Sequence, residues 1–71
     1  MKVYTAQHCP DIYESAYYTL SVHLSEQGAK KAIRNSRRRC LREFNSYHYE
    51  GRTETINDFQ AWGIKEYDVL P

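Results

Sequence analysis

The stretch "AYYTLSVHLSEQGAKKAI", residues 16–33, holds the junction between a strand and a helix, and this junction decides the fold. Residues 16–24 alternate as expected for a strand with one buried face. The face expected to pack inward holds Ala16, Tyr18, Leu20, Val22 and Leu24. The face expected to stay open holds Tyr17, Thr19, Ser21 and His23.

A long helix is predicted directly after this strand. Ser25 can cap the free backbone N–H groups of a helix that begins at Glu26, whose negative charge suits that end. The helix should run to about Phe44. At about 100° per residue, a sector about 120° wide collects residues that suit a core-facing stripe. These residues are Ala29, Ala32, Ile33, Ser36, Cys40 and Phe44.

Two further strands flank this central unit. "KVYTAQH", residues 2–8, has strand composition, and Pro10 and Asp11 then predict the connection of a hairpin. "WGIKEYDVL", residues 62–70, is predicted to form a third strand, with a bulge or twist expected between Ile64 and Tyr67. Residues 45–61 receive no firm assignment, although the spacing of Ile56 and Phe59 permits a short helical turn.

The elements therefore read β-β-α-β within one domain, residues 1–71. A third strand parallel to the second and antiparallel to the first gives the order 2-1-3. We expect an α+β fold in which a three-stranded antiparallel-type sheet carries one long helix on one face.

Positive charge is concentrated on the predicted helix. Residues 29–42, "AKKAIRNSRRRCLR", hold seven of the ten Lys and Arg residues and no acidic residue, although the net charge of the chain is +1. The other residues carry a net charge of −6. Opposite the apolar stripe lie Lys31, Arg34, Arg38 and Arg42, and on its flanks lie Lys30, Arg37 and Arg39.

Like charges three or four residues apart on a helix repel each other by about 0.2–0.5 kcal/mol per pair. Six such pairs cost about 1–3 kcal/mol before screening. One explanation lies within the chain: the C-terminal end of the helix stabilises Arg39 and Arg42, and carboxylates of the chain fold back onto the other cations. The alternative is that an anionic partner supplies the missing charge. The five arginines favour the second reading, because guanidinium groups bind phosphate and carboxylate bidentately. We expect all seven cations to contact an anionic partner.

The partner is expected to be nucleic acid or an acidic protein surface, such as that of a nucleic-acid-handling complex. "RNSRRRCLRE", residues 34–43, looks like the arginine-rich helices that enter RNA grooves, in which an asparagine can read a base edge. Two features count against nucleic acid: no aromatic residue interleaves the basic run, and the acidic remainder repels phosphate. Both alternatives stay open.

The open strand face gives a second hypothesis, in which the chain inhibits another protein by contact through Tyr17, Thr19, Ser21 and His23. Tyrosine supplies contact area at low entropic cost, and Tyr47 and Tyr49 are expected to be exposed as well. An uncovered sheet face also suits a homodimer.

No enzyme, metal or cofactor is expected. No nucleophile elbow, phosphate loop or HExxH motif occurs, and His8, Cys9, His23, Cys40 and His48 lack the short spacings of zinc sites. Cys9 and Cys40 are expected to be free thiols. No apolar run approaches the ~20 residues of a membrane span, and the N-terminus has no apolar signal region, so we expect a cytoplasmic protein.

A resemblance adds to this reading. "VYTAQH" and "AYYTLSVHLSEQGAKKAI", which together cover roughly the first half of the chain, look like small uncharacterised β-β-α-β proteins encoded by phages and bacteria. The resemblance implies a small phage or mobile-element protein that acts in the host cytoplasm. Non-enzymatic inhibitors of host factors are common in that class.

Overall fold

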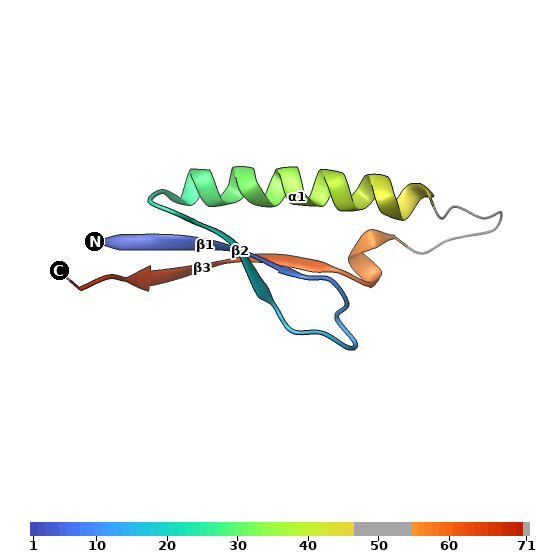
Figure 1. Cartoon of the computed structure of the whole chain (residues 1–71), viewed down its shortest axis with the longest axis horizontal. Coiled ribbons are helices and arrows are strands. Elements are labelled where there is room, and N and C mark those ends of the chain that lie inside the picture. Colours follow the sequence, from blue (N-terminus) through green and yellow to red (C-terminus); the bar gives the residue numbers. More distant parts are fainter. Residues whose placement is uncertain (47–54, 71) are drawn as a thin grey trace.

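The computed structural model of the chain describes residues 1–46 and 55–70, and its element order confirms the predicted β-β-α-β arrangement. The helix lies along one side of the sheet and leaves the other side uncovered (Figure 1). The elements are β1 (Lys2–Cys9), β2 (Tyr18–His23), α1 (Glu26–Ser46), the 3₁₀ helix η1 (Ile56–Asp58) and β3 (Ala61–Asp68).

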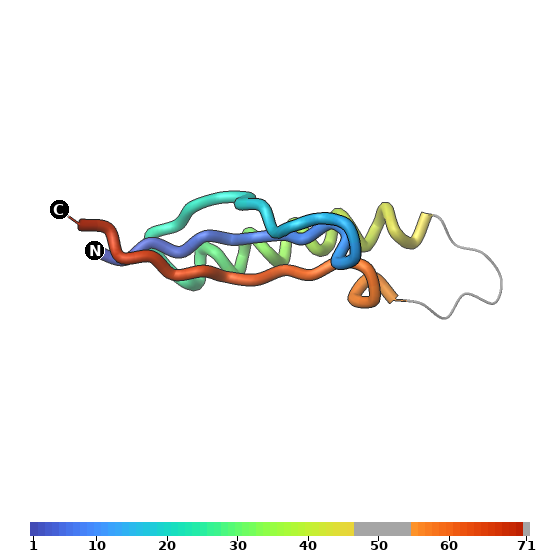
Figure 2. The backbone as a smooth tube through the Cα atoms, turned by 90° about the horizontal axis from the view of Figure 1, so that it is seen from below, coloured from blue at the N-terminus to red at the C-terminus, as the bar shows by residue number. Residues whose placement is uncertain are grey.

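The sheet has the predicted order β2-β1-β3, and β1 is antiparallel to both neighbours. Figure 2 shows the three strands side by side in front of the helix, with β1 in the middle. Pairing of β1 with β3 is continuous from Lys2 opposite Asp68 to Cys9 opposite Ala61. The bulge predicted in β3 is therefore absent. Ile64 faces the helix and Tyr67 faces the uncovered side, as an unbroken strand requires.

The irregularity of the sheet lies instead between β1 and β2. Ala6 is opposite Ser21 and the next residue, Gln7, is opposite Thr19, so Leu20 is an extra residue on β2. Such a bulge bends the strand and turns the side chains that follow it.

This bulge makes the predicted alternation of β2 wrong from Ser21 onward. His23 faces the helix, because a Cβ built on Gly28 of α1 would lie 3.1 Å from the Nδ1 atom of His23. Ser21 also lies on the helix side, opposite the fully buried Ala6. Of the residues predicted to pack inward, Val22 and Leu24 are 61% and 75% exposed. Ala16, which precedes β2, and Tyr18 at its start are exposed as well, so that prediction is wrong for four of its five residues.

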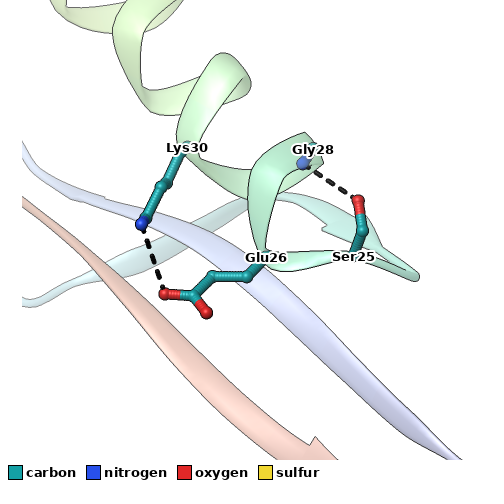
Figure 3. Close-up of polar contacts among 4 residues, drawn as sticks. All are labelled: Ser25, Glu26, Gly28 and Lys30. Carbon is teal, nitrogen blue, oxygen red and sulfur yellow. Dashed lines mark hydrogen bonds and ion pairs between the residues drawn. The ribbon is translucent and has the colours of Figure 1, made fainter.

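Helix α1 begins at Glu26, as predicted. The Ser25 hydroxyl accepts a hydrogen bond of 3.0 Å from the backbone N–H of Gly28, which confirms the predicted cap (Figure 3). The helix continues two residues beyond the predicted end, to Ser46. Its predicted core-facing stripe is confirmed, because all six side chains are buried or half-buried.

The interior is small and partly polar. Among the described residues no large side chain is fully buried, and the buried apolar residues are Ala6, Cys9, Ala29 and Ile56. His8 of β1 stacks on Trp62 of β3, with 4.5 Å between ring centroids, and the Trp62 indole N–H donates a 3.1 Å hydrogen bond to Ser36 of α1. This column of rings ties the helix to the sheet.

The segment before β3 contains the short helical turn that the spacing of Ile56 and Phe59 permitted. Ile56 is buried, and the carbonyl of Phe59 accepts a 2.8 Å hydrogen bond from the N–H of Ile12 in the β1–β2 connection. In that connection, the carboxylate of Asp11 accepts a hydrogen bond from the N–H of Tyr13. The predicted hairpin turn is thus formed and is anchored to the 3₁₀ helix.

Candidate anion-binding surface

Four basic residues of α1, Lys31, Arg34, Arg38 and Arg42, form a row that we call the arginine ridge. All four are exposed, and they lie opposite the stripe that packs on the sheet. Beside the ridge is a surface hollow of about 640 Å³, lined by Gln27, Lys30, Lys31, Arg34, Asn35 and Arg38. The ridge therefore presents its cations to solvent along one side of the molecule.

Carboxylates of the described residues leave the ridge unpaired. Lys30 is the one helix cation that they hold: it lies 3.5 Å from Glu26, one turn earlier (Figure 3). The other ion pair within residues 1–46 and 55–70 joins Lys2 to Glu66 at 2.8 Å and does not involve the helix. Glu50 and Glu54 lie outside the described residues. Within the described residues, the repulsion between the ridge cations is therefore not offset by carboxylates.

Arg37 differs from the ridge because it is engaged with the fold. Its guanidinium donates a 3.0 Å hydrogen bond to the Asn57 side chain and lies 6.0 Å from the centre of the Trp62 ring. Both partners are neutral, so the charge is not compensated. Arg37 was predicted to contact an anionic partner, and the structure places it on the β3 side of the helix as a link between α1 and the column of rings.

Arg39 lies on the opposite flank of α1, toward β2. Together with Leu20, Ser21, Ala32, Asn35 and Ser36 it lines a cleft of about 220 Å³ between α1 and β2. Sequence reasoning missed this cleft, because its β2 wall contains the unpredicted bulge at Leu20. Asn35 lines both the cleft and the hollow beside the ridge, so the two are adjacent.

The helix C-terminus does not account for the cations. Because α1 ends at Ser46, its last turn contains no basic residue and includes Glu43. The favourable field of a helix end falls off within that turn. Arg39 and Arg42 therefore gain little from it, contrary to the explanation that the shorter predicted helix allowed.

The uncovered face of the sheet has a different composition from the predicted one. Tyr17 lies on it, since a Cβ built on Gly63 of β3 would be 3.9 Å from the Tyr17 ring, and Thr19 is exposed. Val22 and Tyr67 join them, whereas Ser21 and His23 are turned toward the helix. Tyr17 is 52% exposed and Tyr67 is 40% exposed. Tyr47 and Tyr49 lie outside the described residues.

The histidine, cysteine and acidic side chains of the described residues form no cluster that could hold a metal ion. Within residues 1–46 and 55–70, no three His, Cys, Asp or Glu side chains are placed to hold a metal ion, and His48 is not among those residues. Cys9 and Cys40 are free thiols; Cys9 is buried and Cys40 is half-buried on the helix stripe. No helix in this part of the chain is long and apolar enough to cross a membrane.

Comparison with protein-family models, with curated proteins and with solved structures found no match to this chain. A row of exposed cations at helical spacing is a surface that can bind a polyanion by charge-assisted hydrogen bonds.

Proposed function

We propose that the chain is a non-enzymatic module that binds nucleic acid through the arginine ridge. The observation that carries this proposal is that all four ridge residues are exposed and that no carboxylate of residues 1–46 and 55–70 pairs with them. Phosphates would supply the negative charge that the described carboxylates do not bring to the ridge. Arginine suits this role because its planar guanidinium binds two phosphate oxygens at once.

The dimensions of the ridge fit a nucleic-acid backbone. From Lys31 to Arg42 the helix rises about 16 Å, with a cation at each turn. A duplex strand carries a phosphate about every 3.4 Å of axis, so several phosphates fall within that length. A nucleic-acid backbone that runs alongside this stretch of the helix would therefore bring several phosphates near the ridge cations.

The surroundings of the ridge favour nucleic acid over an acidic protein. Gln27 and Asn35, which share the hollow with the ridge, are polar. Protein interfaces are usually centred on a buried aromatic or apolar anchor that fills a pocket on the partner. The four ridge residues and these two neighbours offer no such anchor, whereas phosphate contacts need none.

The test is a salt titration of binding to labelled RNA and DNA, measured by fluorescence anisotropy. Neutralising three to four phosphates gives a plot of log K against log salt with a slope of about −2.7 to −3.6 for a duplex. Reversal of Arg34, Arg38 and Arg42 to glutamate should abolish binding at ~50 mM salt, where the electrostatic term is strong.

The control is the double variant Lys2→Gln with Lys65→Gln, which removes two cations outside the helix. It should bind like the wild type. The proposal is wrong if the wild type retains no nucleic acid at low salt, or if the reversed ridge binds as well as the original.

A second candidate function is inhibition of a host protein through the uncovered sheet face. The supporting observation is the exposure of Tyr17, Val22 and Tyr67 on a face that no element of the described chain covers. Apolar side chains gathered in this way typically mark an interaction surface. Under this function, Val22→Asp should abolish partner binding, whereas reversal of the ridge should leave it unchanged.

A further inference from the structure

The cleft between α1 and β2 lies immediately beside the arginine ridge. It has a volume of about 220 Å³ and forms where small helix residues, Ala32 and Ser36, face the bulged part of β2 at Leu20 and Ser21. Asn35 stands at its rim toward the ridge. A polymer whose backbone follows the ridge would therefore pass the mouth of the cleft.

Two walls of the cleft carry hydroxyl groups held in place by the fold. The Ser36 hydroxyl accepts the 3.1 Å hydrogen bond from Trp62, which leaves its own hydrogen free for another acceptor. The Ser21 hydroxyl is 2.6 Å from His23 Nε2, so its position is fixed as well. These groups are oriented before any ligand arrives, which lowers the entropic cost of binding.

The rim of the cleft carries groups that the fold does not use. The Asn35 amide makes no hydrogen bond to another described residue, and no described carboxylate pairs with Arg39. An asparagine amide offers donors and an acceptor side by side, which matches the edge of a base. A guanidinium plane can stack on the face of a base.

We infer that this cleft takes one unstacked base of a single-stranded nucleic acid whose phosphates lie along the arginine ridge. In this arrangement Asn35 and Ser21 hydrogen-bond to the base edge, Arg39 stacks on the base or binds its phosphate, and Leu20 with Ala32 contacts its apolar face. The inference rests on the proposed function and specifies its substrate class.

The size of the cleft and its position select a single strand. Sites for drug-sized ligands begin at about 300 Å³, so about 220 Å³ suits one base rather than two. In a duplex the bases are stacked and paired inside, and none is free to enter a lateral cleft, whereas single strands can turn bases outward. Arg39 also supplies the stacking plane that the basic run lacks in aromatic form.

The test compares Asn35→Ala with Asn45→Ala, using a 12-nucleotide single strand and the corresponding duplex at ~100 mM salt. Both substitutions remove an exposed asparagine amide from α1, but only Asn35 lines the cleft. We expect Asn35→Ala to weaken single-strand binding about tenfold and to leave duplex binding and the salt slope unchanged. Asn45→Ala should change neither affinity. Ser21→Ala provides a second cleft variant from a different element.

The outcomes separate the inference from the proposed function. If the wild type binds duplex as tightly as single strands and Asn35→Ala has no effect, the inference is overturned while ridge binding stands. The same holds if Asn35→Ala weakens both polymers equally. If the wild type binds neither polymer, or if binding survives reversal of the ridge, the proposed function fails and the inference fails with it.

Discussion

Replacing Arg34 and Arg38 with glutamine should make the free protein more stable while weakening its binding to nucleic acid. The two arginines contribute to five like-charged contacts at helical spacing, and Lys30 is the one member of these contacts that a described carboxylate, Glu26, pairs with. Each costs about 0.2–0.5 kcal/mol, so their removal should stabilise the fold by about 1–2.5 kcal/mol at low salt. The contacts are Lys30–Arg34, Lys31–Arg34, Arg34–Arg37, Arg34–Arg38 and Arg38–Arg42.

Few other contributions to the free energy of unfolding change in this variant. Both positions are exposed, and glutamine has nearly the helix propensity of arginine. For a domain of this size 1 kcal/mol shifts Tm by about 4–8 °C, so the Tm of the variant should rise by at least about 4 °C. Thermal unfolding followed by far-UV circular dichroism measures this. In 1 M NaCl, where the Debye length is about 3 Å, most of the gain should disappear.

The matched control changes the net charge equally but elsewhere. The double variant Lys2→Gln with Lys65→Gln loses the ion pair with Glu66 and the contact between Lys65 and the Tyr67 ring, 5.3 Å from its centre. We expect no gain in Tm from it. If the ridge variant is no more stable than the wild type at low salt, the ridge charges are compensated within the protein, and the argument for an external anion is refuted.

Three further predictions concern the scaffold. Ser25→Ala removes the helix cap and should cost about 1 kcal/mol in urea unfolding, an effect that Ser25→Asp should largely avoid. Trp62→Phe should lower the free energy of unfolding by about 0.5–1.5 kcal/mol, because it breaks the hydrogen bond to Ser36. A double-mutant cycle with Ser36→Ala should show that the two substitutions are coupled. Additive effects of the two substitutions on stability would contradict this role of the hydrogen bond. The hydrogen bond and charge of Glu66 raise the pKa of Lys2 above its ordinary 10.5, so the pair's stabilisation is complete below pH 10.5 and is lost as pH rises through the raised pKa. The stability difference between the wild type and Lys2→Gln should close over that range, and a difference that persists would show that the pair does not act through charge.

The features that the sequence predicted correctly depend on neighbours along the chain. The cap at Ser25 and the start of the helix involve residues within one turn of each other. The core-facing stripe and the exposure of the arginine ridge follow from helical geometry alone. The order of the strands is the exception, because it joins distant residues; it was predicted from the rule that strands connected through a helix run parallel, together with the placement of the third strand beside the first.

The features that were missed depend on pairing between distant residues. Alternation in residues 16–24 is unbroken, and the bulge at Leu20 arises only where β2 meets Ala6 and Gln7 of β1. Conversely, the spacing of Ile64 and Tyr67, which puts two apolar residues on different faces of an alternating strand, suggested a bulge. In the structure the strand is regular, and the two side chains simply lie on opposite faces of it. The cleft between α1 and β2 could not be predicted, because it needs that bulge and the helix together.

The separation between the inward stripe of α1 and its outward ridge has a consequence for how this chain can change. Residues that hold the helix on the sheet, such as Ala29 and Ser36, are distinct from those that would meet a ligand, such as Arg34 and Arg38. Substitutions in the ridge can therefore change what the surface binds without requiring compensating substitutions in the interior. The same property makes the outer helix surface a practical template for randomised libraries, in which thousands of variants would share one backbone.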